Sequence, residues 1–283
     1  MIWINKFIYW CPINIVSNRI HKNRDMKKKL FFLVWLWGIA CLAFGQEEFE
    51  KKVFRTASGD ELNYRLLRPE NEQASEKYPL VIFLHGAGER GSDNEKQLFH
   101  GSKMWLDPAN RKEYPAYVLF PQCPENYYWA YLERPSVFYS KKMLADFPIS
   151  PVMVVLKQLI DRYLLLPQID KKRVYIIGIS IGAIGVYDMT IRYPEIFAAA
   201  IPICGIVNPK RLEAAKGVKF RLFHGDADND VPTSGSRRAY KALKKAGAEV
   251  QYIEFPGVGH ESWKQAFDLP DFMKWLFLQK KEY

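Results

Sequence analysis

The alternation of two apolar patterns constrains the fold of this chain most. From residue 51 onward, short continuous apolar runs alternate with segments whose apolar residues recur at helical spacing. The first two runs, 52–57 and 61–68, flank the turn sequence SGD and predict an antiparallel hairpin. A hairpin followed by strand–helix alternation predicts an α/β fold with a doubly wound, mostly parallel sheet.

Six further strands and five helices are expected after the hairpin. The strands lie at 79–85, 116–120, 173–179, 198–204, 219–224 and 249–255. The helices lie at 150–164, 181–192, 208–216, 234–245 and 261–281, the last broken by Pro270. The connection between the strands at 198–204 and 219–224 has room for one helix and no large lid. Two long stretches, 86–115 and 121–148, are expected to be irregular, and loops of such length are usually functional or flexible.

Positive charge is concentrated at the N-terminus. The chain has 283 residues and a formal net charge of +10. Residues 1–45 hold seven Lys/Arg and one acid, which leaves a net charge of +4 for residues 46–283. Because that remainder has no basic stripe and no basic helix with interleaved aromatics, nucleic acid is not an expected partner.

The same N-terminal region has the pattern of a secretory signal peptide. Residues 26–29 (MKKK) are followed by the apolar run 30–44 and by small residues at the −3 and −1 positions of a cleavage site after Gly45. The run is too short for a spanning helix, so we expect a secreted or periplasmic protein with no stable membrane insertion after cleavage. A lipoprotein anchored through Cys41 is disfavoured because the leucine usual three residues earlier is missing.

These features divide the chain into three parts. Residues 26–45 are the predicted signal peptide, and residues 1–25 are interpreted as a mis-assigned start upstream of Met26. Residues 46–283 are expected to form a single domain. This part holds two cysteines, Cys123 and Cys204, which an exported protein could pair or keep free and buried. The residues leave the oligomeric state open.

A G-x-S-x-G motif supplies a candidate nucleophile. Gly178-Ile-Ser180-Ile-Gly182 lies between the strand predicted at 173–179 and the helix predicted at 181–192. So tight a turn requires flanking positions without side chains. The helix N-terminus behind Ser180 favours negative charge that develops there. The first helical residue, Ile181, is a candidate donor to an oxyanion.

A nucleophilic serine needs a base, and His260 is the strongest candidate. It lies in a glycine-rich loop after the last predicted strand, which places it at the same sheet edge as Ser180. His85 and His224 each end a strand and precede a glycine, so packing and loop anchoring are their expected roles. His100, in a polar stretch, is expected to be solvent-exposed.

Three aspartates follow the strand predicted at 219–224: Asp226, Asp228 and Asp230. Their spacing invites a calcium-loop interpretation, which fails because Val231 replaces the required glycine and Arg237 the final glutamate. No metal or cofactor is therefore expected. The residues alone leave the choice among the three aspartates open.

The glycines after the third strand imitate a dinucleotide motif. Gly86-x-Gly88-x-x-Gly91 has the spacing of that motif, but a dinucleotide loop opens the first βαβ unit and meets an acid after the next strand. Here the expected window holds Asp107-Pro108, predicted to lie in a loop. We interpret the glycines instead as a loop that brings backbone close to a substrate carbonyl.

Several segments together resemble the α/β-hydrolase superfamily. These are the order Ser180, Asp, His260 and the sequences HGxxDxxVP, LHGAGERGSDN, FPQCPE and PICG. They are similar to the dienelactone hydrolase, carboxylesterase and prolyl-oligopeptidase-like branch, including secreted feruloyl and acetyl-xylan esterase-like proteins. The resemblance covers residues 50–281 and implies an α/β-hydrolase fold, Asp228 as the acid and Ala87 as the second oxyanion donor. It implies a serine esterase that acts on small or plant-polysaccharide esters.

Two other functions remain open: a serine peptidase of prolyl-oligopeptidase type, and a non-catalytic binding protein with this fold. An aromatic cluster could wall a substrate site or form a structural apolar patch; its members are Tyr127, Tyr128, Trp129, Tyr131, Phe138 and Tyr139. Tyr128, Trp129 and Glu89 are therefore candidate substrate contacts. Glu89, Arg90 and Asn94 are also expected to fix their loop.

Overall fold

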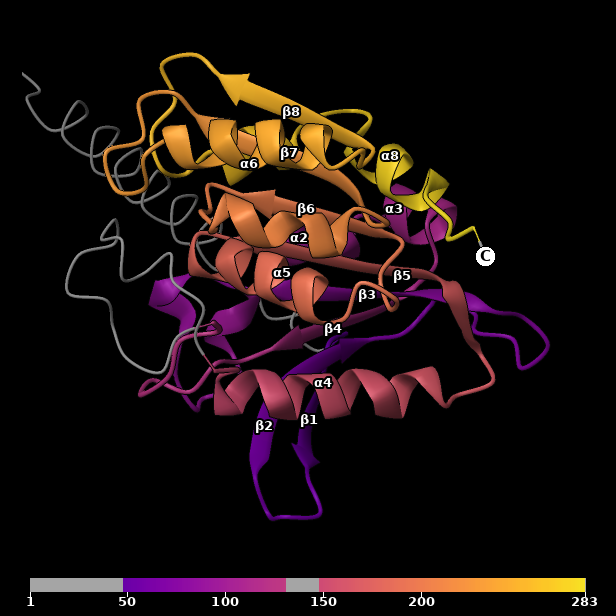
Figure 1. The fold of residues 1–283 in the computed structure, drawn as a ribbon. Coiled ribbons are helices and arrows are strands. Elements are labelled where there is room, and N and C mark those ends of the chain that lie inside the picture. Colours follow the sequence, from indigo (N-terminus) through magenta and orange to yellow (C-terminus); the bar gives the residue numbers. More distant parts are fainter. Residues whose placement is uncertain (1–47, 131–147, 283) are drawn as a thin grey trace, which may run out of the picture. The chain divides into compact units, whose positions relative to one another are not determined.

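Eight strands form one sheet in the order β1-β2-β4-β3-β5-β6-β7-β8 in the computed structural model (Figure 1). The structure describes residues 48–130 and 148–282. β1 pairs with β2, and β2 with β4, in antiparallel orientation. The pairs from β4 through β3, β5, β6 and β7 to β8 are parallel. This is the predicted doubly wound sheet preceded by an antiparallel hairpin.

The elements lie close to their predicted positions. The strands are β1 (Glu50–Arg55), β2 (Glu61–Leu67), β3 (Tyr78–Leu84), β4 (Tyr117–Pro121), β5 (Ile169–Ile179), β6 (Ala199–Ile203), β7 (Lys219–Gly225) and β8 (Val250–Phe255). The α-helices are α2 (Ser102–Leu106), α3 (Pro108–Glu113), α4 (Pro151–Leu164), α5 (Ile181–Arg192), α6 (Ser234–Lys245), α7 (Trp263–Phe267) and α8 (Phe272–Leu278). Three short 3₁₀ helices complete the described elements: η1 (Ala87–Glu89), η2 (Lys96–Leu98) and η3 (Pro209–Ala215).

Helices cover both faces of the sheet, which explains its continuous apolar strands. In β3, Leu80, Ile82 and Leu84 belong to one buried cluster, which also takes in the apolar faces of α4, α5 and α6. Val81 and Phe83 belong to the other cluster, together with residues of α2, α7 and α8. Figure 1 shows α4, α5 and α6 side by side on one face.

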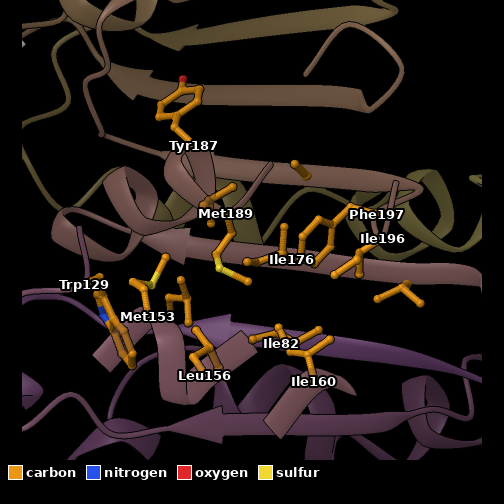
Figure 2. Packing of buried hydrophobic residues seen from close by; sticks show 14 of the residues in the cluster. Ile82, Trp129, Met153, Leu156, Ile160, Ile176, Tyr187, Met189, Ile196 and Phe197 are labelled. Atoms are coloured by element: carbon orange, nitrogen blue, oxygen red, sulfur yellow. The ribbon is translucent and has the colours of Figure 1, made fainter. Parts of the chain in front are cut away.

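The first of these clusters has its centre between β3, β5 and α4. Figure 2 shows Ile82 and Ile176 of the sheet facing Met153 and Leu156 of α4, with Trp129 beside Met153. The labelled side chains of this cluster are all nearly or fully buried. This packing fixes the sheet edge from which the candidate site residues project.

The stretch 86–115 is less irregular than expected, because it holds η1, η2, α2 and α3. The physical reason is visible at Asp107, whose side chain accepts hydrogen bonds from the N–H groups of Ala109 and Asn110 and so caps α3. Pro108 occupies the first helical position, where its missing N–H costs nothing. Asp107 lies between α2 and α3 as predicted, but the prediction that Pro108 lies in a loop was wrong.

Other details of the C-terminal half agree with or refine the predictions. The segment 261–281 is broken before Pro270, since α7 ends at Phe267 and α8 begins at Phe272. The connection between β6 and β7 holds η3 alone, a 3₁₀ rather than an α-helix, and so has no large lid at this point. Cys123 and Cys204 are both free and buried, which decides between the two alternatives for this pair.

Several predictions fall on residues outside the described ranges. These are the upstream start (1–25), the signal peptide (26–45) with Cys41, and the aromatic residues Tyr131, Phe138 and Tyr139. Within 48–130 and 148–282, no helix has both the length and the apolar character needed to cross a membrane.

Candidate active site

Ser180 lies at the turn between β5 and α5, in a backbone conformation that is unusual for serine. Its φ is +53°, in the region that favours glycine, and such a conformation costs of order 1–3 kcal/mol. The flanking glycines are sterically required. A Cβ on Gly178 would lie 2.4 Å from the Gly182 carbonyl oxygen, and one on Gly182 would lie 2.1 Å from that of Leu84. The motif therefore forms the predicted strained strand–turn–helix unit.

A chain of hydrogen bonds joins Ser180 to His260 and Asp228. His260 Nε2 lies 2.9 Å from Ser180 Oγ, and His260 Nδ1 lies 2.8 Å from Asp228 Oδ2. Because a carboxylate can only accept, Nδ1 carries the ring proton, and Nε2 has a lone pair free for the serine hydroxyl. The loop after β7 and the loop after β8 meet at the same sheet edge as the turn after β5, as parallel topology requires.

The structure selects Asp228 among the three candidate aspartates. Asp226 faces elsewhere, where its Oδ1 accepts the Gly257 N–H at 2.6 Å. Asp230 contributes only its backbone N–H, which donates to Asp228 Oδ1 at 2.9 Å. The Val231 N–H donates to the same oxygen at 2.8 Å.

The Asp228 carboxylate is held in its charged form. Burial alone would raise the pKa of Asp228, but hydrogen bonds from His224, His260 and the Val231 N–H hold that pKa well below its usual value. The carboxylate therefore stays charged and can stabilise an imidazolium at His260.

His224 contacts the candidate acid Asp228, a role that the sequence did not predict. It is fully buried, as the packing prediction requires, but its Nε2 lies 3.1 Å from Asp228 Oδ2 and 2.9 Å from the Val231 carbonyl oxygen. Its Nδ1 lies 2.7 Å from Ser236 Oγ. Since both neighbours of Nε2 are acceptors, Nε2 is protonated and donates to Asp228. The available signal was that His224, at the end of β7, precedes Asp228 by four residues.

The two predicted oxyanion donors follow adjacent strands, Ala87 after β3 and Ile181 after β5. Ile181 is the first residue of α5 and Ala87 the first of η1, so neither N–H has a partner within its helix. β3 and β5 are paired, with Leu84 opposite Gly178 at their ends. The loops that carry these two N–H groups therefore leave the sheet side by side.

The loop after β3 is anchored by the residues expected to fix it. Arg90 donates to the carbonyls of Ala87 at 3.1 Å and Glu125 at 2.8 Å. The Asn94 side chain donates to the Lys52 carbonyl at 3.0 Å. His85 Nδ1 lies 2.6 Å from the Gly86 carbonyl oxygen.

Of the aromatic residues near this loop, Trp129 and Tyr128 are buried, whereas Tyr127 is 37% exposed. Trp129 is fully buried, and its indole N–H donates to the His85 carbonyl at 3.1 Å (Figure 2 shows its packing). Tyr128 is 6% exposed, and the Arg90 guanidinium lies 4.1 Å from its ring centroid. Such burial does not fit direct substrate contact by Trp129 or Tyr128, and favours the structural patch for both.

His100 does not have the solvent exposure expected for it. Its side chain is 19% exposed and lies 3.7 Å from Glu89 through Nε2 and Oε1. Burial lowers the pKa of His100. Both residues lie in the stretch 86–115, whose path across the site edge could not be read from the sequence.

One group of side chains in the described ranges has metal-ligating chemistry. A ligand atom from each of Cys204, Asp228 and His260 lies within 4.8 Å of the other two. Two of the three are already hydrogen-bonded to each other, and His260 also contacts Ser180. Asp228 and His260 are thus engaged in the Ser180–His260–Asp228 chain, and Cys204 is a buried free thiol beside them.

Comparisons with known proteins relate this chain to carboxylesterases. Residues 71–276 match the profile of the phospholipase/carboxylesterase family. The chain is 27% identical over 205 residues to the "Probable carboxylesterase SOBER1-like" of Arabidopsis thaliana, covering 64% of this chain and 71% of that protein.

Solved structures show the same fold. The structure of a thermostable esterase has a TM-score of 0.77 and 34% identity, covering 84% of this chain. This chain corresponds to 64% of that esterase, slightly less than two thirds of its length. A ferulic acid esterase shares the fold with a TM-score of 0.61 at 16% identity. The match over residues 71–276, on an eight-stranded sheet of this order, shows that the chain belongs to the phospholipase/carboxylesterase family of α/β-hydrolases.

Proposed function

We propose that the protein is a serine esterase that cleaves carboxylic esters through an acyl-enzyme. The observation that carries the proposal is the hydrogen-bond chain Asp228–His260–Ser180, with distances of 2.8 and 2.9 Å. In this mechanism His260 Nε2 takes the proton as Ser180 Oγ attacks the ester carbonyl. Asp228 fixes the ring tautomer and stabilises the imidazolium that forms.

The reaction then proceeds in two steps, acylation of Ser180 and hydrolysis of the acyl-enzyme. The Ile181 and Ala87 N–H groups stabilise the oxyanion of the tetrahedral intermediate. His260 returns its proton to the leaving alcohol, which departs and leaves Ser180 acylated. Water, deprotonated by His260, attacks the acyl-enzyme and releases the carboxylic acid, restoring the serine hydroxyl.

As substrates we propose acyl or feruloyl esters of plant polysaccharides, or related small esters. The resemblance to secreted feruloyl and acetyl-xylan esterase-like proteins motivates this choice. The short β6–β7 connection holds η3 alone, which is compatible with a bulky substrate that binds at a solvent-accessible site. The test is a panel of acetyl, feruloyl and long-chain esters beside a matched amide, each with a Ser180→Ala control.

The panel separates the alternatives. An esterase hydrolyses one or more esters, and Ser180→Ala abolishes that turnover. Faster cleavage of the amide would indicate a peptidase, and no turnover of any substrate would favour a non-catalytic binding protein.

We also propose that the protein is exported after removal of residues 26–45. The support is the signal-peptide pattern of the sequence. Intact-mass analysis of exported protein is expected to show Gln46 as the first residue. A lipidated Cys41, or a chain that retains residues before it, would contradict cleavage after Gly45.

A further inference from the structure

Glu89 points into the site rather than towards solvent. Its side chain is 12% exposed, and its carboxylate accepts from the backbone N–H groups of Gly86 and of Glu89 itself. A Cβ placed on Gly86 would lie 3.1 Å from Glu89 Oε2 and 3.7 Å from the Cβ of Ser180. The carboxylate therefore lies beside the backbone that carries Ala87 and near the nucleophile turn.

These contacts enclose the Ala87 peptide. The Arg90 side chain holds the Ala87 carbonyl at 3.1 Å, while the Glu89 carboxylate engages the N–H groups on either side of Ala87 and Gly88. The N–H groups of Gly86 and Glu89 are thus occupied, whereas the Ala87 N–H, at the start of η1, has no partner within that helix. A carboxylate is the strongest acceptor available for this task, since hydrogen bonds to a charged group are about twice as strong as neutral ones.

His100 also lies near the Glu89 carboxylate. Its Nε2 lies 3.7 Å from Glu89 Oε1, and its ring centroid lies 5.0 Å from that of Trp263. The Trp263 ring in turn lies 5.6 Å from that of His260 in an edge-on contact. A continuous set of contacts therefore joins the loop after β3 to the loop that carries the candidate base.

The Ser180–His260–Asp228 mechanism makes no use of this second carboxylate–imidazole pair. Burying a carboxyl group is costly unless it is hydrogen-bonded, and burial raises the pKa of Glu89. The outer part of the loop is already anchored by Arg90 and Asn94. Arg90 also holds the Ala87 carbonyl, whereas Glu89 engages the Gly86 N–H, on the part of the loop next to Ser180.

We propose that Glu89 is a positioning residue for the oxyanion hole. Its carboxylate fixes the Gly86–Glu89 backbone so that the Ala87 N–H faces the developing oxyanion, and His100 braces the carboxylate. The inference rests on the serine esterase function proposed above.

The test uses Glu89→Ala, Glu89→Gln and His100→Asn, with Glu125→Gln as the matched control. Glu125 is an exposed glutamate on the neighbouring loop. For each variant, kcat and KM are measured with p-nitrophenyl acetate, and the inhibition constant with a trifluoromethyl ketone. The ketone forms a serine adduct whose oxyanion occupies the hole, so it reports the positioning that a merely structural residue would not affect.

Glu89→Ala is expected to lower kcat by about 10²-fold, the loss typical of one oxyanion donor, with KM nearly unchanged. The inhibition constant of the ketone should rise by a similar factor. Glu89→Gln keeps one oxygen acceptor and should lose less, as should His100→Asn. Glu125→Gln should match the wild type.

Normal kcat in both Glu89 variants would overturn the inference. A lower kcat with unchanged ketone affinity would also overturn it, because the oxyanion hole would then be intact. If Glu89→Ala does not fold, kcat and the ketone inhibition constant are compared in Glu89→Gln and His100→Asn instead. A wild-type protein that neither turns over esters nor binds the ketone would instead overturn the proposed function, and this inference with it.

Discussion

His224 Nε2 lies 3.1 Å from the Asp228 oxygen, Oδ2, that His260 Nδ1 contacts at 2.8 Å. The side chains of His224 and Asp228 are both fully buried, so this contact is shielded from water. The carboxylate therefore receives one donor from a buried histidine and one from the candidate base.

Removing the hydrogen bond from His224 to Asp228 is expected to lower the activity of the candidate triad without abolishing it. A hydrogen bond to a charged group contributes about 1.5–3 kcal/mol, so His224→Phe should lower kcat by roughly 10- to 100-fold. Ser236→Ala is the matched control, because it removes the partner of Nδ1 and leaves the Nε2–Asp228 contact in place. Equal steady-state kinetics for the two variants would exclude this role for His224.

Asparagine substitutions should separate the two neighbouring aspartates. Asp228→Asn removes the charge that fixes the His260 tautomer and should reduce kcat by about 10⁴-fold. Asp226→Asn should leave kcat close to the wild-type value, since Asp226 contacts the Gly257 N–H and not His260. Steady-state hydrolysis of p-nitrophenyl acetate measures both, and a crippled Asp226→Asn would contradict the assignment.

His85 should make stability depend on pH. Its Nδ1 donates to the Gly86 carbonyl and its Nε2 accepts the Cys123 N–H at 3.0 Å, an arrangement that only the neutral ring allows. Burial lowers the pKa of His85 to about 4 in the folded protein, against 6.5 when exposed. Between these values the unfolded chain binds a proton that the folded chain does not, so stability falls as pH decreases.

The loss of free energy of unfolding caused by His85 should reach about 3 kcal/mol near pH 4. Urea unfolding at a series of pH values measures it, and His85→Gln should have a shallower pH dependence than the wild type. Because the carboxylates titrate in both proteins, the difference between the two slopes isolates His85. Identical slopes would show that the ring is not held neutral.

The two cysteines of the described ranges should be unreactive in the folded protein. Cys123 and Cys204 are free and buried, and burial raises the pKa of Cys123 to about 12. Burial also raises the pKa of the Cys204 thiol. Peptide mapping after iodoacetamide treatment should find both unmodified in the native state and both modified in denaturant. A peptide pair linked through Cys123 and Cys204 would contradict the structure.

The sequence predicted the parts of the molecule that depend on local pattern. The mostly parallel, doubly wound character of the sheet followed from strand–helix alternation, and the Ser180 turn from glycines at fixed offsets from the nucleophile; the strand order came from the structure. The Asp107-Pro108 cap of α3 was readable by the same local rules, but it was overlooked because the surrounding stretch is polar.

Other features depend on contacts that pattern does not encode. Three aspartates share one loop, and only the meeting of the β7 and β8 loops brings Asp228 to His260. The aromatic cluster gave no sign of which rings face inward, and Trp129 is buried against α4 (Figure 2). The approach of His100 to Glu89 depends on the path of η2 and α2, which the sequence does not specify.

Labelling with a fluorophosphonate, followed by intact-mass and peptide analysis, tests most directly whether Ser180 is an activated nucleophile. One adduct per chain is expected, on Ser180, with labelling lost in Ser180→Ala and strongly slowed in His260→Ala. An adduct on another residue, or equal labelling of the wild type and Ser180→Ala, would show that Ser180 is not the nucleophile.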